Sequence, residues 1–144
     1  MDTIKFNCKI SPTDPGVPLG MEIWLDDVKF FDQDHIDQDY IVEHEISDDD
    51  GDRELRFVLK NKQPIHTQVD AQGNILSDAV LLITDMRFDE INCDYLISTL
   101  ARYHHDYNGS QDPVVDEFYE TMGCNGTVSL KFTTPIYIWL LENM

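Results

Sequence analysis

The sequence predicts an all-β fold, a β-sandwich or jelly roll of roughly eight to ten short antiparallel strands with one short helix near residues 112–122. Segments that alternate apolar and polar side chains recur about every 8–12 residues, and clusters of Gly, Pro, Asn and Asp separate them. A chain of 144 residues with 42% hydrophobic residues can bury a core without disulfides or metal. Because no internal repeat or linker interrupts the pattern, we expect one domain over residues 1–144.

The N-terminal part begins with a strand and a hairpin. Residues 3–10 alternate strictly, which predicts a half-buried strand. Residues 11–20 contain three prolines and therefore form a loop. Residues 20–31 are rich in apolar side chains on both sides of Asp26-Asp27, which indicates a hairpin with one face toward the core.

The middle of the chain predicts several more strands. Residues 40–46 and 53–60 alternate, and the Asp50-Gly51 pair between them is a strong hairpin turn signal. A short strand is expected over 63–69, followed by a turn over 70–74. The apolar run 79–83 predicts a strand covered on both faces, and 86–91 continues the alternation.

The C-terminal part is less uniform. Residues 95–107 fit a helix through Leu96 and Leu100 or a strand through their alternation, and we favour a strand for the second half because an Asn108-Gly109 turn closes it. Asp112-Pro113 resembles the start of a helix that Gly123 ends, with Val114, Phe118 and Met122 forming one apolar stripe. Residues 127–134 alternate, and the apolar segment 136–141 predicts a central strand.

Charge and cysteine content exclude several classes of partner. The chain has 28 Asp and Glu against 10 Lys and Arg, a net charge of -18 that repels nucleic acid and anionic membranes. The odd, widely spaced Cys8, Cys93 and Cys124 favour buried thiols over disulfides or zinc. No signal peptide and no apolar run long enough for a membrane span are recognisable, so we expect a soluble protein made in a reducing cytosol.

An acidic run supplies the candidate metal site. Residues 26–54 contain 13 carboxylates, and like charge at this density favours a bound cation. Calcium is the natural candidate because it prefers carboxylate and carbonyl oxygens, with Asp48, Asp50 and Asp52 as ligands. The spacing does not match an EF-hand, since Gly51 is displaced and Leu59 occupies the closing position. The alternative is a solvated loop that aids solubility.

Aromatic side chains in polar surroundings supply the candidate ligand site. Trp24, Tyr40, Tyr103 and Tyr107 lie among polar residues, as flat rings must if they stack on the apolar faces of sugars. The alternative is that loops or the second sheet cover them. Trp139, within the apolar C-terminal segment, is expected in the core.

Transition-metal and catalytic sites are weakly indicated. In a strand, His104 and His105 point to opposite faces, so they cannot bind one ion together. No nucleophile motif stands out, and Cys93 and Cys124 lack a recognisable catalytic context. The sequence therefore favours a protein that is not an enzyme.

The pattern of short strands, the Asp-Asp hairpin, the acidic loop and the closing strands together resemble a β-sandwich of the carbohydrate-binding-module type. The short acidic chain is also similar in style to small proteins of marine tailed phages, including cyanophages. The first resemblance implies non-catalytic sugar binding, with calcium assistance as in xylan-binding modules. The second adds that the sugar would be bound on a virion surface. Our first interpretation is therefore a carbohydrate-binding protein; the alternative is a phage structural or assembly protein, such as a virion decoration or tail component, that works through protein–protein contacts or as a homo-oligomer.

Overall fold

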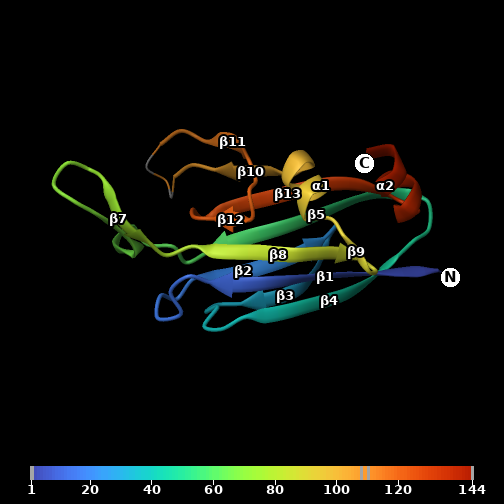
Figure 1. Cartoon of the computed structure of the whole chain (residues 1–144), viewed down its shortest axis with the longest axis horizontal. Coiled ribbons are helices and arrows are strands. Elements are labelled where there is room, and N and C mark those ends of the chain that lie inside the picture. Colours follow the sequence, from blue (N-terminus) through green and yellow to red (C-terminus); the bar gives the residue numbers. More distant parts are fainter. Residues whose placement is uncertain (1, 108, 110, 144) are drawn as a thin grey trace.

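A computed structural model describes residues 2–107, 109 and 111–143. Two antiparallel sheets pack face to face, and a separate two-stranded sheet extends from one end (Figure 1). The five-stranded sheet has the order β12-β8-β1-β4, with β9 beside β8: β1 (Thr3–Pro12), β4 (Tyr40–Ser47), β8 (Leu81–Phe88), β9 (Ile91–Asn92) and β12 (Thr121–Met122).

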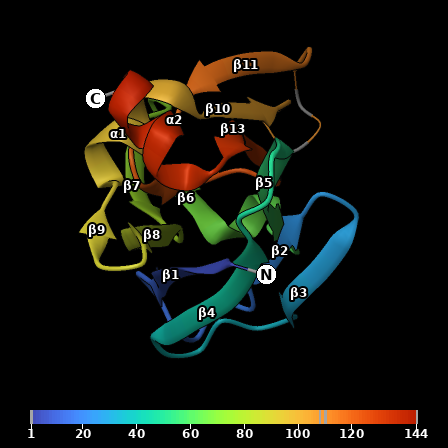
Figure 2. The ribbon, with the colours of Figure 1, turned by 90° about the vertical axis from the view of Figure 1, so that its right-hand side faces the viewer.

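The six-stranded sheet has the order β11-β10-β13-β5-β2-β3. Its strands are β2 (Gly20–Leu25), β3 (Val28–Gln33), β5 (Gly51–Lys60), β10 (Arg102–His105), β11 (Val114–Glu117) and β13 (Gly126–Thr134). The remaining elements are η1 (Pro64–His66), β6 (Thr67–Val69), β7 (Ile75–Asp78), α1 (Asp94–Leu100) and α2 (Ile136–Asn143). Viewed end-on, the six-stranded sheet curves from β11 to β3 around the five-stranded sheet (Figure 2). The predicted all-β sandwich is confirmed.

A cluster of aromatic rings joins the two sheets. Phe88 of β8 lies 5.4 Å from Phe6 of β1 and 5.3 Å from Phe132 of β13, measured between ring centroids. Phe6 also meets Phe57 of β5 at 6.3 Å, and Trp139 of α2 contacts both Phe88 and Phe132. These rings come from both sheets and from α2, so the cluster fixes the helix to the sandwich. The expectation that Trp139 belongs to the core is confirmed.

The alternating segments at the N-terminus form the predicted elements. The apolar side chains of residues 4–10 are buried in β1, and β2 and β3 form the hairpin, with Asp26 at φ 51° in its turn. Val28 nevertheless remains exposed. Residues 70–74 form the predicted turn, in which the Asp70 carboxylate accepts the N–H groups of Gln72 and Asn74, and these bonds lower the pKa of Asp70. Cys8 and Cys93 are buried thiols, and burial raises their pKa.

The predicted helix over 112–122 is wrong. Residues 114–117 form β11 on the edge of β10, and residues 121–122 form β12 in the other sheet. Phe118 and Met122 are both fully buried because the chain crosses between the sheets here, with Glu120 at φ 68°. Because they are four residues apart, they have the spacing of an apolar stripe on a helix, which led to the wrong prediction. Gly109 lies at φ 86°, whereas Asn108 of the predicted turn lies outside the described residues.

The predicted strand over 136–141 is also wrong, since these residues form α2. The buried positions 136, 139 and 140 follow a helical spacing, but exposed Tyr137, Ile138 and Leu141 are apolar too, so the sequence shows no period. The Asp48 carboxylate accepts the N–H of Ile136 at 2.8 Å and thereby satisfies a free amide at the start of the helix.

Three smaller expectations need correction. Asp50-Gly51 is not a hairpin turn, because β4 and β5 belong to different sheets and the loop between them crosses the sandwich. The strand expected over 63–69 starts with the η1 turn and is shortened to β6. β8 is not covered on both faces, since Leu82 is only half-buried. The first half of 95–107 is helical, as α1, and the favoured strand in the second half is confirmed as β10.

No helix among the described residues has the length and apolarity needed to cross a membrane.

We expect Phe88→Ala to lower the free energy of unfolding by about 3–5 kcal/mol, because it removes the ring that contacts β1, β13 and α2 at once. Urea denaturation measures the change. Ile41→Ala is the control, since Ile41 is 69% exposed and should cost less than about 0.5 kcal/mol. Equal losses in the two variants would contradict the central role of the cluster.

Candidate functional site

The outward-facing residues of the six-stranded sheet form one candidate surface. Strand alternation turns Leu55, Phe57 and Leu59 of β5 inward, so Asp52, Glu54, Arg56 and Lys60 face outward, whereas Arg53 lies on the inward side at the end of the strand. The strand register then places Trp24, Arg56, Ser129 and Arg102 in one row across β2, β5, β13 and β10. We call this surface the outer face.

Trp24 is half-buried among charges at the β2 side of the outer face. Its Nε1–H donates to Glu22 Oε1 at 2.9 Å, and this bond is the main reason that the pKa of Glu22 lies below its ordinary value. Arg56 Cζ and Lys29 Nζ lie 5.4 and 5.7 Å from the ring centroid. Lys60 meets Glu22 at 3.2 Å, which adds to the network. The ring therefore already has cationic neighbours.

The other three candidate aromatic residues do not join Trp24. Tyr40 lies on β4 of the other sheet, 5.8 Å from the Phe31 ring, and its hydroxyl donates to Asp37. Tyr107 follows β10 at φ 55°, with its ring beside His105. The expectation of an exposed ring is wrong for Tyr103, which is 6% exposed. The four residues do not form one stacking platform.

Tyr103 is instead part of the interior. Its hydroxyl accepts the N–H of Cys124 at 2.9 Å and donates to the carbonyl of the same residue. Burial is the main cause that raises the pKa of Tyr103 above its ordinary value. The side chain thus fixes the approach of the chain to β13.

The three candidate calcium ligands of the acidic loop, Asp48, Asp50 and Asp52, lie in different surroundings. Asp48 accepts a hydrogen bond from the first residue of α2, Asp50 is exposed in the loop, and Asp52 faces an open pocket. The hydroxyl of Thr134 donates to the Asp49 carbonyl and ties the loop to β13. Among the described residues, no group of three or more His, Cys, Asp or Glu side chains is arranged to hold a metal ion. Calcium binding here stays a prediction.

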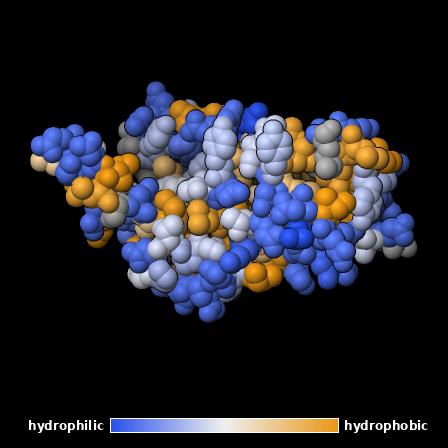
Figure 3. Space-filling view, in the orientation of Figure 1, coloured by the Kyte–Doolittle hydropathy of each residue, from blue (hydrophilic) through white to orange (hydrophobic). Residues whose placement is uncertain are grey.

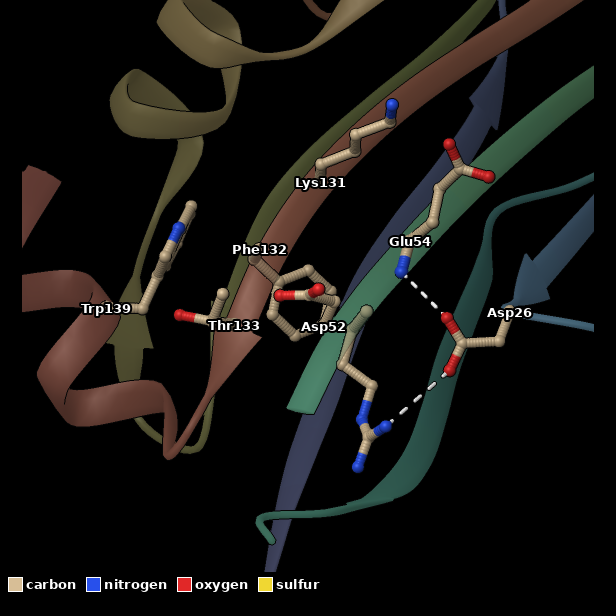
Figure 4. Close-up of a pocket in the computed structure, with 8 residues that line it drawn as sticks. Asp26, Asp52, Glu54, Lys131, Phe132, Thr133 and Trp139 are labelled. Atoms are coloured by element: carbon tan, nitrogen blue, oxygen red, sulfur yellow. Dashed lines mark hydrogen bonds and ion pairs between the residues drawn. The ribbon is translucent and has the colours of Figure 1, made fainter. Parts of the chain in front are cut away.

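The pocket that contains Asp52 has a volume of about 520 Å³ and lies between β5, β13, α2 and the β2–β3 turn (Figure 4). Its polar walls come from Asp26, Asp52, Glu54 and Lys131, and its apolar side from Phe132 and Trp139. Asp26 Oδ1 accepts the Glu54 N–H at 2.9 Å, and Asp26 N–H donates to the Glu54 carbonyl at 2.8 Å. These reciprocal bonds hold the turn against β5.

A second open pocket, of about 370 Å³, continues along the outer face and shares Lys131 and Trp139 with the first. Arg102 and His104 of β10 line its other end. The two pockets therefore adjoin at Lys131 and Trp139. We call the pair the groove, with its acidic end at Asp52, where Arg53 also lies, and its basic end at Arg102.

A second candidate surface is the arm, which we define as residues 64–78 with η1, β6 and β7. It projects from one end of the long axis, opposite α2, and neither of its strands pairs with a sandwich sheet (Figure 1). Four apolar side chains on it are between 54% and 77% exposed: Ile65, Val69, Ile75 and Leu76. Figure 3 shows apolar side chains gathered below the polar tip of the arm.

The root of the arm is firmly held. Lys62 is 3% exposed, and its ammonium group lies 2.5 Å from Asp78 Oδ1 and donates to the Ala79 carbonyl. Thr67 Oγ1 donates to the same Asp78 oxygen at 2.6 Å. Ala79 N–H donates to the His66 carbonyl at 3.0 Å. The arm thus leaves the sandwich in a defined direction.

Comparison of this chain with models of known protein families, with curated proteins and with solved structures found no match. The two surfaces are therefore interpreted from their own geometry.

Sequence reasoning missed the arm and the basic end of the groove. The adjacent Ile75 and Leu76 stand alone between polar residues, and this pair was a usable signal of an exposed apolar surface. Arg102 and Lys131 gave no comparable signal, because only the pairing of β10 with β13 brings their strands together.

We expect Tyr103→Phe to lower the free energy of unfolding by about 1–3 kcal/mol, because it leaves the N–H and carbonyl of Cys124 without their buried partner. Thermal or urea unfolding measures the loss. Tyr95→Phe is the matched control, since Tyr95 is 86% exposed. An unchanged stability in Tyr103→Phe would contradict the interior role of this hydroxyl.

Proposed function

We propose that this protein is a structural or assembly subunit that works through protein–protein contacts and that the arm is its docking element. The exposed apolar surface of the arm is the observation that supports this most directly. A two-stranded sheet without further strands is marginally stable in water, and exposed apolar groups add to its cost. A partner that covers these groups removes that cost.

The partner we propose is a second copy of the chain. Copies with a net charge of -18 repel one another, so contact between them is most favourable where carboxylates are scarce. Residues 55–77 contain one carboxylate, Asp70, and residues 121–141 contain none. The first segment forms most of the arm, and the second ends in α2, whose Ile138 and Leu141 are 55% and 80% exposed. The hydroxyl of Tyr137 donates to Asp89, so the contact is centred on Ile138 and Leu141.

These two low-charge surfaces lie at opposite ends of the molecule (Figure 1). Docking of the arm of one copy against α2 of the next would therefore be head-to-tail rather than two-fold symmetric. Such contacts produce a ring when they close and a filament when they do not. Both outcomes suit a virion decoration or tail component.

We expect the wild-type protein to self-associate with rising concentration in analytical ultracentrifugation, and the double variant Ile75→Ser/Leu76→Ser to stay monomeric. Ile138→Ser/Leu141→Ser should also stay monomeric. A mixture of the two variants should form dimers, because one variant supplies an intact arm and the other an intact α2. Association should strengthen with salt, since at about 0.15 M the Debye length is about 8 Å and charge repulsion is screened.

Ile41→Ser is the control, because it alters an exposed apolar residue of β4 away from both surfaces. A wild-type protein that remains monomeric at every concentration would overturn the choice of partner. Self-association of Ile138→Ser/Leu141→Ser by itself would instead favour arm-to-arm pairing, and failure of the mixed variants to dimerise would contradict the head-to-tail contact.

Carbohydrate binding is the second candidate, favoured by the groove and by the half-buried Trp24 on the same outer face. A groove with polar walls and an aromatic side offers hydrogen bonds to hydroxyl groups and an apolar contact for a sugar ring. Calcium at Asp48, Asp50 and Asp52 belongs to this proposal, and of these carboxylates Asp52 lines the acidic end of the groove.

If the outer face binds glycans, Trp24→Ala should abolish the signal on a glycan array while lowering the free energy of unfolding by less than about 2 kcal/mol. The array is run with calcium and with chelator, and loss on chelation would support the calcium site. Tyr95→Ala serves as an exposed aromatic control. A large loss of thermal stability in Trp24→Ala would show that the ring supports the fold rather than a ligand.

A further inference from the structure

Two of the ten lysine and arginine side chains, Arg102 and Lys131, make no ion pair among the described residues. Each of the other eight lies 3.9 Å or less from a carboxylate oxygen: Lys5, Lys9, Lys29, Arg53, Arg56, Lys60, Lys62 and Arg87. In a chain with 28 carboxylates, a cation without one is unusual.

These two cations line the same pocket, the basic end of the groove, with a volume of about 370 Å³. His104 lies two residues from Arg102 on β10 and therefore faces the same way, whereas Lys131 comes from β13. The pocket is completed by the apolar Leu100, Val115 and Trp139, and by Ser129 and Asn143. None of its lining residues carries a carboxylate.

The nearest carboxylates by strand register have other partners. Glu54 lies opposite Lys131, but its Oε2 accepts the Ser129 hydroxyl at 2.9 Å and its Oε1 lies 3.5 Å from Arg56. Glu117 lies opposite Arg102 and accepts the hydroxyl of Tyr119. Both acids therefore have hydrogen-bond or ion-pair partners other than the two cations.

Arg102 is fixed in place by the backbone at the end of α1. Its Nη1 donates to the carbonyls of Thr99 and Ala101 at 2.9 and 2.8 Å. Its Nε and Nη2 make no hydrogen bond to any described residue. A guanidinium held by one nitrogen keeps the rest of its planar fork for a ligand, and that fork matches a carboxylate or sulfate group.

We propose that the basic end of the groove binds a small ring-shaped ligand that carries a single carboxylate or sulfate group. Arg102 and Lys131 hold the anionic group, with His104 beside them, and Leu100, Val115 and Trp139 contact the ring. The net charge of -18 disfavours polyanions, so the site selects one anionic group on a small body. None of the residues that line this pocket belongs to the arm.

Isothermal titration calorimetry tests the site with four probes. Glucuronate and cyclohexanecarboxylate each carry a carboxylate on a ring, glucose is a ring without the charge, and acetate is the charge without a ring. We expect at least one ring carboxylate to bind about tenfold more tightly than both glucose and acetate. Preference for glucuronate would identify a sugar acid, and preference for cyclohexanecarboxylate an apolar acid.

Arg102→Gln and Lys131→Gln should each weaken that binding about tenfold, while Lys9→Gln should leave it unchanged. Lys9 is the matched control because it is an exposed lysine of the other sheet, paired with Asp39. Far-UV circular dichroism and thermal unfolding check that the variants fold. If acetate binds as tightly as the ring acids, or if Lys131→Gln binds like wild type, the proposed site is wrong.

Discussion

The contact of Phe88 with Phe6, Phe132 and Trp139 is the interaction on which the rest of the structure depends. It joins a strand of each sheet to the C-terminal helix through rings whose centroids lie 5.3 to 6.4 Å apart. Because β10 pairs only with the first part of β13, residues 130–134 would otherwise leave a free sheet edge. Trp139 packs at that edge, so the same side chain closes the core and forms one wall of the groove. The position of the groove on the outer face therefore depends on how Trp139 packs in the core.

Charge determines which parts of this surface can make contacts. Lys60 meets three carboxylates, those of Glu22, Asp32 and Asp34, at 2.5 to 3.2 Å, and such networks offset part of the repulsion that a charge of -18 produces. The arm contains two carboxylates, Asp70 and Asp78, and α2 contains one, Glu142, and both elements expose apolar side chains. The basic end of the groove stands apart because its cations are not neutralised. The first surface is thus defined by apolar groups that the rest of the chain leaves uncovered, and the second by cations that no described carboxylate pairs with.

Much of the fold could be predicted from alternation alone. β1, β2, β5 and β13 each have one buried and one exposed face, and their sequences show it. The wrong predictions concern segments in which apolar side chains are not all buried on one face of the element. All of residues 136–141 are apolar, so exposed Ile138 concealed the helical period of α2. Phe118 directly follows β11 of one sheet and Met122 belongs to β12 of the other, so their burial does not come from one helix face. For the candidate site, Trp24 lies on the expected face of its strand, whereas Tyr103 points inward. Arg102 and Lys131 are brought together only by the pairing of β10 with β13, and no local sequence pattern indicates that pairing.

Helix α2 links the two proposed activities. Its inward residue Trp139 borders the groove, whereas Ile138 and Leu141 form the surface that would receive the arm of another copy. The eight residues of α2 form one short helix, so its inward and outward side chains shift together. The hydrogen bond from Ile136 N–H to Asp48 fixes its first turn. A ligand in the pocket would contact Trp139 and Asn143, and a docked copy would contact Ile138 and Leu141, so both would meet the same helix from different sides. Any effect of the ligand on the affinity of docking would be matched by an equal effect of docking on the affinity of the ligand.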